Sequence, residues 1–154
     1  MQKLKWIKHI ATGAGAGFSP VLPGTVGTLW GIPLAWAVFQ LDELWMRIAV
    51  CALLTLIAIP ICAIAEPLLC RGKDPGCIVA DEFCTLPICY LGLLFTPAVI
   101  IAGFIFHRIF DITKPPPIRQ SQKLKGGIGI VADDVLAALF ALAANHILFS
   151  WILK

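Results

Sequence analysis

The chain has 154 residues, of which 59% are hydrophobic and 14% are charged, and its mean hydropathy is +0.90. Soluble domains carry about a quarter charged residues, so this composition excludes a disordered chain and favours an integral membrane protein. Twelve Lys and Arg against nine Asp and Glu give a net charge of +3, too small to indicate a nucleic-acid partner. We predict one membrane-embedded domain over residues 1–154.

Four stretches without Lys, Arg, Asp or Glu are the candidate membrane segments: residues 10–41, 48–65, 83–106 and 135–153. A membrane-crossing helix needs about 20 apolar residues. Gly and Pro interrupt residues 13–27, so we predict a helix only over about 25–41. A polar turn at 42–43 then leads to a second helix over about 44–69, with a kink near Pro60.

The third stretch contains Thr96-Pro97 close to Gly92, where we expect a break into two short antiparallel helices. With residues 135–153 as the last helix, the fold class is an all-α integral membrane bundle of about five short or tilted helices. Five crossings place ten of the twelve Lys and Arg on the cytoplasmic side, in agreement with the positive-inside rule.

Six of the nine acidic residues fall in three short segments that begin or end apolar stretches: Asp74 with Asp81 and Glu82, then Asp111, then Asp133 and Asp134. On this topology all three segments meet the cytoplasmic membrane surface. Carboxylates next to hydrocarbon are costly unless cations compensate them, and proteins commonly hold Mg2+ through carboxylates. We therefore predict a Mg2+ site here. The other interpretation is that these acids are helix caps and salt-bridge partners.

Basic residues are interleaved with these acids. Arg108 and Asp111 are three residues apart on one helical face, and Lys114 follows. Further along, we predict a phosphate-binding segment made of Arg119, Lys123 and Lys125 and the backbone N–H groups of Gly126 and Gly127. Acids for a metal beside cations for an anion are the arrangement expected for phosphoryl chemistry. A solvated basic loop is the alternative.

Two further features concern the ligands of the site. Residues 18–28 are uncharged but rich in Gly and Pro, and we predict that Thr25 and Thr28 contact the polar head of a lipid substrate. The alternative is that these threonines cap the first spanning helix. The three histidines, His9, His107 and His146, are isolated in the sequence, so we expect no zinc site.

Four blocks of the sequence resemble, in order, the phosphatidylglycerophosphatase A family: SPVLPGTVGT at 19–28, IVADEF at 78–83, RIFDITKPPPI at 108–118 and GGIGIVADD at 126–134. The resemblance covers about residues 12–140. It implies a Mg2+-dependent phosphatase of the bacterial inner membrane, multi-pass and all-helical, with its active site on the cytoplasmic side. Such an enzyme hydrolyses the terminal phosphomonoester of phosphatidylglycerophosphate, an anionic phospholipid, to phosphatidylglycerol and phosphate.

The resemblance also implies roles for single positions. The family's acids match Asp81, Glu82, Asp111, Asp133 and Asp134, and its cations match Arg108 and Lys114. We expect Asp81, Glu82, Asp133 and Asp134 to be metal ligands, Arg108 and Lys114 to hold phosphoryl oxygens, and Arg119 or Lys125 to bind the diester phosphate. Asp111 or Asp74 would be the base or the nucleophile, or Asp111 would only orient Arg108. The sequence departs from the family pattern at His107 and Gln122, among other positions.

Two other classes of function remain at this point. One is a small membrane cation transporter that uses its acids as a relay, although no acid falls at the middle of a predicted span. The other is a non-catalytic lipid-binding subunit, which the intact acidic motifs argue against.

Overall fold

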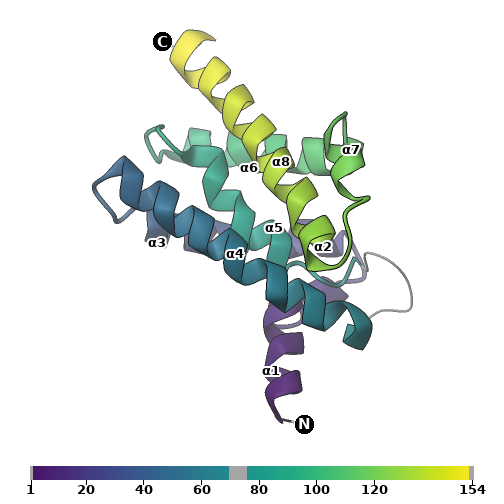
Figure 1. The fold of residues 1–154 in the computed structure, drawn as a ribbon. Coiled ribbons are helices and arrows are strands. Elements are labelled where there is room, and N and C mark those ends of the chain that lie inside the picture. The colour runs from purple at the N-terminus through teal and green to yellow at the C-terminus, as the bar shows by residue number, and fades with distance from the viewer. Residues whose placement is uncertain (1, 70–75, 153–154) are drawn as a thin grey trace.

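The computed structural model describes residues 2–69 and 76–152, and every regular element in these ranges is helical (Figure 1). This confirms the predicted all-α fold. In chain order the elements are α1 (Gln2–Ala11), η1 (Ala16–Phe18), α2 (Pro23–Thr28), α3 (Gly31–Val38), α4 (Leu44–Leu69), α5 (Ala80–Thr85), η2 (Leu86–Tyr90), α6 (Pro97–Thr113), α7 (Ile118–Ser121), α8 (Gly127–His146) and η3 (Ile147–Ile152).

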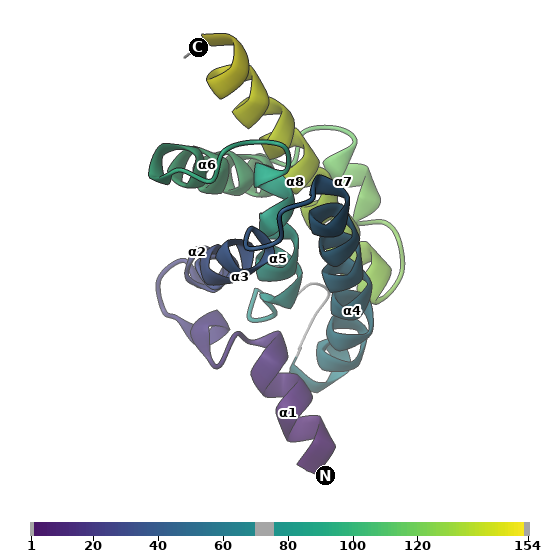
Figure 2. The ribbon, with the colours of Figure 1, turned by 90° about the vertical axis from the view of Figure 1, so that its left-hand side faces the viewer.

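The two longest helices, α4 and α8, lie side by side and run in opposite directions (Figures 1 and 2). Their close approach depends on Gly127 at the start of α8, because a Cβ there would lie 2.1 Å from the backbone oxygen of Ile59 in α4. The first turns of α8, which carry Asp133 and Asp134, are therefore held against α4.

Helix α6 crosses α8 and packs against it (Figure 2). It begins at Pro97, after Thr96, whose Oγ1 accepts a hydrogen bond from the Val99 backbone N–H at 3.4 Å. The break predicted at this point is confirmed. Near the far end of α8, the buried Asn145 side chain donates to the backbone oxygens of Cys89 and Val99 at 3.1 and 3.2 Å. Asn145 thus ties η2, α6 and α8 together.

The expectation of about five helices is wrong, because the apolar stretches are divided into more helical segments than predicted. Residues 25–41 form no single helix: α2 ends at Thr28 and α3 runs only from Gly31 to Val38. Pro33 cannot donate a backbone hydrogen bond to the preceding turn, which is one physical reason for the division. The second predicted helix, 44–69, is confirmed by α4.

Within residues 2–69 and 76–152, two helical segments are long and apolar enough to cross a membrane, Leu44–Leu69 and Gly127–Trp151. By contrast, α3 has eight residues and is about 12 Å long at 1.5 Å per residue, well short of the ~30 Å hydrocarbon core. Helix α5, with six residues, is shorter still. These lengths do not support the five crossings that the sequence predicts.

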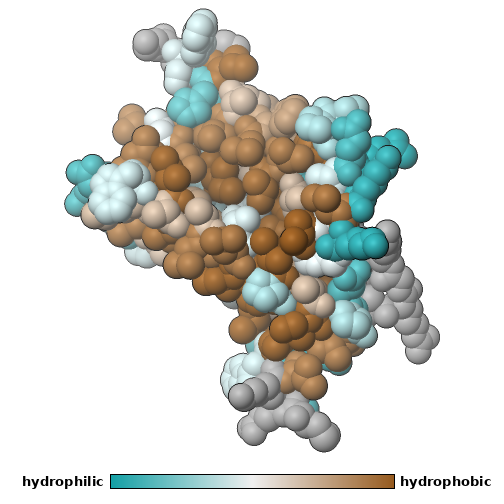
Figure 3. All heavy atoms as spheres, viewed as in Figure 1, coloured by the Kyte–Doolittle hydropathy of each residue, from teal (hydrophilic) through white to brown (hydrophobic). Residues whose placement is uncertain are grey.

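Hydrophobic and hydrophilic residues are separated on the face of the molecule that Figure 3 shows. Hydrophobic residues cover the middle of this face over α4 and α8, whereas hydrophilic residues gather at the side where α7 lies. Large apolar side chains are exposed on α4 and α6, among them Leu53, Leu56, Ile101, Ile105 and Ile109. An exposed apolar area of this kind marks a surface that contacts lipid or another protein.

Candidate active site

The glycine-rich segment before α3 is packed directly against the start of α5. The Val79 backbone N–H donates to the Ala11 oxygen at 2.8 Å, and α2 approaches Val79 so closely that a Cβ on Gly27 would lie 2.3 Å from the Val79 Cβ. This packing brings Thr28, at the end of α2, to Glu82 in the first turn of α5.

A hydrogen-bonded group of three side chains joins α2, α5 and α6. Arg108 Nη1 of α6 lies 2.8 Å from Glu82 Oε2 and donates to Thr28 Oγ1 at 3.2 Å, while the Thr28 hydroxyl contacts Glu82 Oε2. Thr28 is fully buried, and the side chains of Arg108 and Glu82 are each only 13% exposed. The backbone of Gly24 closes this group, because a Cβ there would lie 2.5 Å from Glu82 Oε1.

The ion pairs continue from Arg108 along α6 to α8. Arg108 Nη1 lies 2.9 Å from Asp111 Oδ2, and Lys114 Nζ lies 3.7 Å from Asp111 Oδ1. Lys114 Nζ also donates to Asp133 Oδ2 at 2.6 Å, and Gln122 Nε2 donates to the same oxygen at 2.9 Å. The cations therefore bridge acids that are far apart in the sequence.

The environment of Lys114 keeps this side chain charged. Burial by itself lowers the pKa of Lys114, but the hydrogen bond to Asp133 and the charges of Asp133, Asp111 and Asp134 raise it more. The pKa of Lys114 thus lies above its usual 10.5. Lys114 is a fixed positive charge at neutral pH, as a phosphate-binding group requires.

Three carboxylates converge beside these cations. Asp111, Asp133 and Asp134 are buried, and each offers one oxygen atom such that the three atoms lie within 4.8 Å of one another. The further negative charges that act on Asp134 come from Asp81 and Glu82. Five acids from α5, α6 and α8 therefore contribute to one strongly negative region.

The oxygen atoms of this region fit a hard divalent cation. Asp134 Oδ1 is buried and has no hydrogen-bond partner among the described residues. A buried carboxylate oxygen without a partner is costly unless a cation or water satisfies it. Carboxylate oxygens are also the ligands that Mg2+ prefers. Asp111, Asp133 and Asp134 are thus able to hold such an ion.

Comparison with known proteins assigns the chain to a family. Residues 9–149 match the family described as phosphatidylglycerophosphatase A. The chain belongs to this family. It is 34% identical over 139 residues to the phosphatidylglycerophosphatase A of Escherichia coli, covering 86% of this chain and 77% of that protein.

Two further relatives are of similar likeness. The phosphatidylglycerophosphatase A of Haemophilus influenzae is 35% identical over 159 residues, covering 96% of this chain and 91% of that protein. A Bacteroides thetaiotaomicron protein, provisionally named a phosphatidylinositol-3-phosphatase, is 37% identical over 142 residues and covers 86% of each chain. No solved structure matches the chain.

For this member of the phosphatidylglycerophosphatase A family, the structure groups the predicted acids differently from the sequence. The predicted metal ligands were Asp81, Glu82, Asp133 and Asp134. The converging group instead combines Asp111 with Asp133 and Asp134, while Glu82 pairs with Arg108. Asp81 is buried, and its Oδ1 accepts the Glu82 backbone N–H at 3.0 Å. The metal roles of Asp81 and Glu82 stay predictions.

The remaining predicted residues are more dispersed. Asp74 lies outside the described residues. Arg119 on α7 and Lys125 and Gly126 before α8 are exposed, and Gly127 is buried against α4. Thr25 is partly buried in α2, one turn before Thr28.

For three residues of the site, the sequence predicted no role. Gly24 lies against the Glu82–Arg108 pair, and Gln122 donates to Asp133. His107 is fully buried, with Nε2 3.9 Å from Asp134 Oδ1. Only His107 had a usable signal, since it precedes Asp111 by four residues and so shares its helix face.

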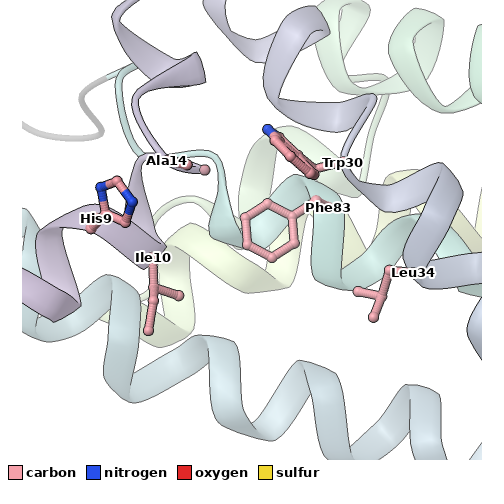
Figure 4. Close-up of a pocket in the computed structure, with 7 residues that line it drawn as sticks. His9, Ile10, Ala14, Trp30, Leu34 and Phe83 are labelled. Carbon is pink, nitrogen blue, oxygen red and sulfur yellow. The ribbon is translucent and has the colours of Figure 1, made fainter.

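An apolar pocket of about 290 Å³ is lined by residues of α1, of the Gly-rich segment after it, of α3 and of α5. In Figure 4, Trp30 and Phe83 lie at its centre, with His9 and Ile10 on one side and Leu34 on the other. Phe83 directly follows Glu82 in α5, so one short helix supplies both a carboxylate of the site and a wall of the pocket.

Proposed function

We propose that the chain is a Mg2+-dependent phosphatase that hydrolyses the terminal phosphomonoester of phosphatidylglycerophosphate to phosphatidylglycerol and phosphate. The observation that carries the proposal is the convergence of Asp111, Asp133 and Asp134 within 4.8 Å beside Lys114 and Arg108. Membership of the phosphatidylglycerophosphatase A family supports the same reaction and does not favour a transporter or a non-catalytic subunit.

Asp111, Asp133 and Asp134 are the proposed ligands of Mg2+. The ion, when bound, would offset the charge of the phosphoryl oxygens and lower the pKa of a water molecule. Asp111 touches both Arg108 and Lys114, so this carboxylate also fixes the two cations. We assign Asp111 to this double role in preference to that of a base. Asp74 as base stays a prediction.

Arg108 and Lys114 are the proposed binding groups for the phosphoryl oxygens. Arg108 Nε is buried and has no hydrogen-bond partner among the described residues, so an anion bound at this side chain would satisfy the donor. Glu82 and Thr28 hold the opposite edge of the guanidinium through Nη1. Fixed donors of this kind stabilise charge that develops in the transition state without reorganising during the reaction.

A lipid substrate accounts for the apolar surroundings of the site. We infer that the apolar pocket at Trp30 and Phe83 receives part of an acyl chain, while the phosphomonoester reaches Arg108 and Lys114. We further propose that the two long apolar segments anchor the protein in the bacterial inner membrane, with the acidic region on the cytoplasmic side. The exposed Arg119 and Lys125 would then bind the diester phosphate.

The test uses purified protein in detergent with three substrates: phosphatidylglycerophosphate, phosphatidylinositol 3-phosphate and water-soluble glycerol 3-phosphate. We expect phosphate release from the first lipid only when Mg2+ is present. Asp134→Asn should abolish release, whereas the matched variant Asp42→Asn, in an exposed turn, should not. Full turnover in excess chelator would contradict the proposal. Faster release from the inositol lipid would assign the substrate named for the Bacteroides relative instead.

A further inference from the structure

A second pocket, of about 250 Å³, lies where α1 packs against the end of α4 (Figure 2). Its walls include three residues of α1, two from the segment that follows α1 and one from the end of α4: Lys5, Lys8, His9, Thr12, Phe18 and Leu69. None of these six described residues takes part in the ion pairs of the acidic region. The proposed reaction therefore gives this pocket no role.

The packing of α1 directs its lysines into the pocket. Lys5, Lys8 and Thr12 follow one another at spacings of three and four residues, which places them on one side of the helix. Ile7 and Ala11 lie in the apolar cluster that includes residues of α4, so α1 is held against α4. The Thr12 hydroxyl donates to the Lys8 backbone oxygen at 2.9 Å and so continues the last turn of α1.

The charge of these lysines is not offset by the described residues. Neither Lys5 nor Lys8 forms an ion pair with a carboxylate in the described part of the chain. Phe18, which is 62% exposed, and Leu69 add apolar surface to the same pocket. Two cations beside apolar side chains suit a phosphate that is joined to an apolar body, as in a phospholipid, better than a free phosphate ion.

We propose that this pocket binds the headgroup phosphate of an anionic phospholipid other than the substrate, with Lys5 and Lys8 as its cations. Pockets that enclose a whole small ligand measure ~300–1,000 Å³, so this smaller one would take the polar head and leave the acyl chains in the bilayer. The exposed Trp6 of α1 suits a membrane interface, where Trp is enriched. The inference rests on the proposed membrane anchoring but on no step of the proposed reaction.

Native mass spectrometry of the purified protein in non-ionic detergent counts bound lipids and gives their affinities. The probe is phosphatidylserine, which is anionic but is not the product of the proposed reaction. One lysine next to an anionic lipid strengthens binding by about fivefold, so the double variant Lys5→Gln/Lys8→Gln should bind phosphatidylserine ~25-fold more weakly. Arg47→Gln, which removes a cation in the first turn of α4, should bind it as the natural protein does.

A thermal melt checks the fold of each variant, and the Tm of the double variant should be unchanged because neither lysine forms an ion pair with a described carboxylate. Equal affinity of the natural protein for phosphatidylserine and phosphatidylcholine would overturn the proposal, as would equal affinity of the natural protein and the double variant for phosphatidylserine. Displacement of phosphatidylserine by inorganic phosphate would assign the pocket to a free anion instead. Phosphate release from the same preparations tests the proposed function separately, since lipid binding at α1 requires no turnover.

Discussion

Replacing Gly24 by Ala should impair the reaction without unfolding the protein. An added Cβ would lie 2.5 Å from Glu82 Oε1 and 2.9 Å from Arg108 Nη2, whereas ordinary contacts lie at 3.4–4 Å. The Glu82 carboxylate must therefore move by about 1 Å, and Arg108, held by the same carboxylate, must follow. A displacement of this size in a group that positions the substrate costs ~100-fold in rate.

The stability of the Gly24→Ala variant should change little. Both groups that the Cβ meets are ends of side chains, and Ala in a helix restricts the unfolded chain, which stabilises by about 0.4–1 kcal/mol. Two other Gly→Ala variants serve as controls. A Cβ added at Gly76 meets no described residue within 4 Å, so Gly76→Ala should leave activity and Tm unchanged. A Cβ added at Gly27 would lie 2.3 Å from the Val79 Cβ, so Gly27→Ala should lower the Tm.

The assay measures phosphate release from phosphatidylglycerophosphate micelles at saturating Mg2+, together with a thermal melt of each variant. We expect a large fall in kcat for Gly24→Ala at an unchanged Tm. An unchanged kcat would refute the positioning role of the Glu82–Arg108 pair, because the steric conflict is unavoidable. A fall in both kcat and Tm would show that the contact of Gly24 with Glu82 and Arg108 stabilises the fold instead.

Three other substitutions test separate parts of the structure. Asn145→Ala should lower the free energy of unfolding by about 1–3 kcal/mol, since the Cys89 and Val99 carbonyls lose their donor. Denaturant titration measures this change, and the specific activity of the folded variant should equal that of the natural protein. Asp111→Asn should raise the Mg2+ concentration for half-maximal phosphate release ~10-fold or more. Because the pKa of Lys114 is raised, its stabilising contribution is present below about 10.5 and disappears only above that pH. The Tm difference between the natural protein and Lys114→Gln should accordingly be constant near neutrality and shrink in strong alkali.

The separation of metal-binding and cation-positioning acids has a mechanistic consequence. Glu82 is committed to Arg108 and Thr28, whereas Asp134 keeps an oxygen without a hydrogen-bond partner among the described residues. Removing Glu82 should therefore weaken substrate positioning more than metal binding, and removing Asp134 should do the reverse. The two effects are distinguishable, because the first lowers kcat for the lipid and the second raises the Mg2+ concentration required.

Local features of the fold were determined by the sequence alone. The start of α4 at Leu44 and the start of α6 at Pro97 follow from the polar turn before Leu44 and from the Thr96-Pro97 step. These features depend on neighbouring residues only, since apolar length, capping and the missing N–H of proline act within one or two turns. The acids at the ends of the apolar stretches are likewise visible in the sequence.

Only the tertiary structure decided which acids meet. Asp111 joins Asp133 and Asp134 because α6 crosses α8, and the first turns of α8 approach α4 because Gly127 leaves room for the Ile59 carbonyl. Contacts between helices depend on the fit of whole faces, which spacing along one chain does not encode. For the same reason, no local pattern of the sequence predicts that Gly24 lies against Glu82 and Arg108.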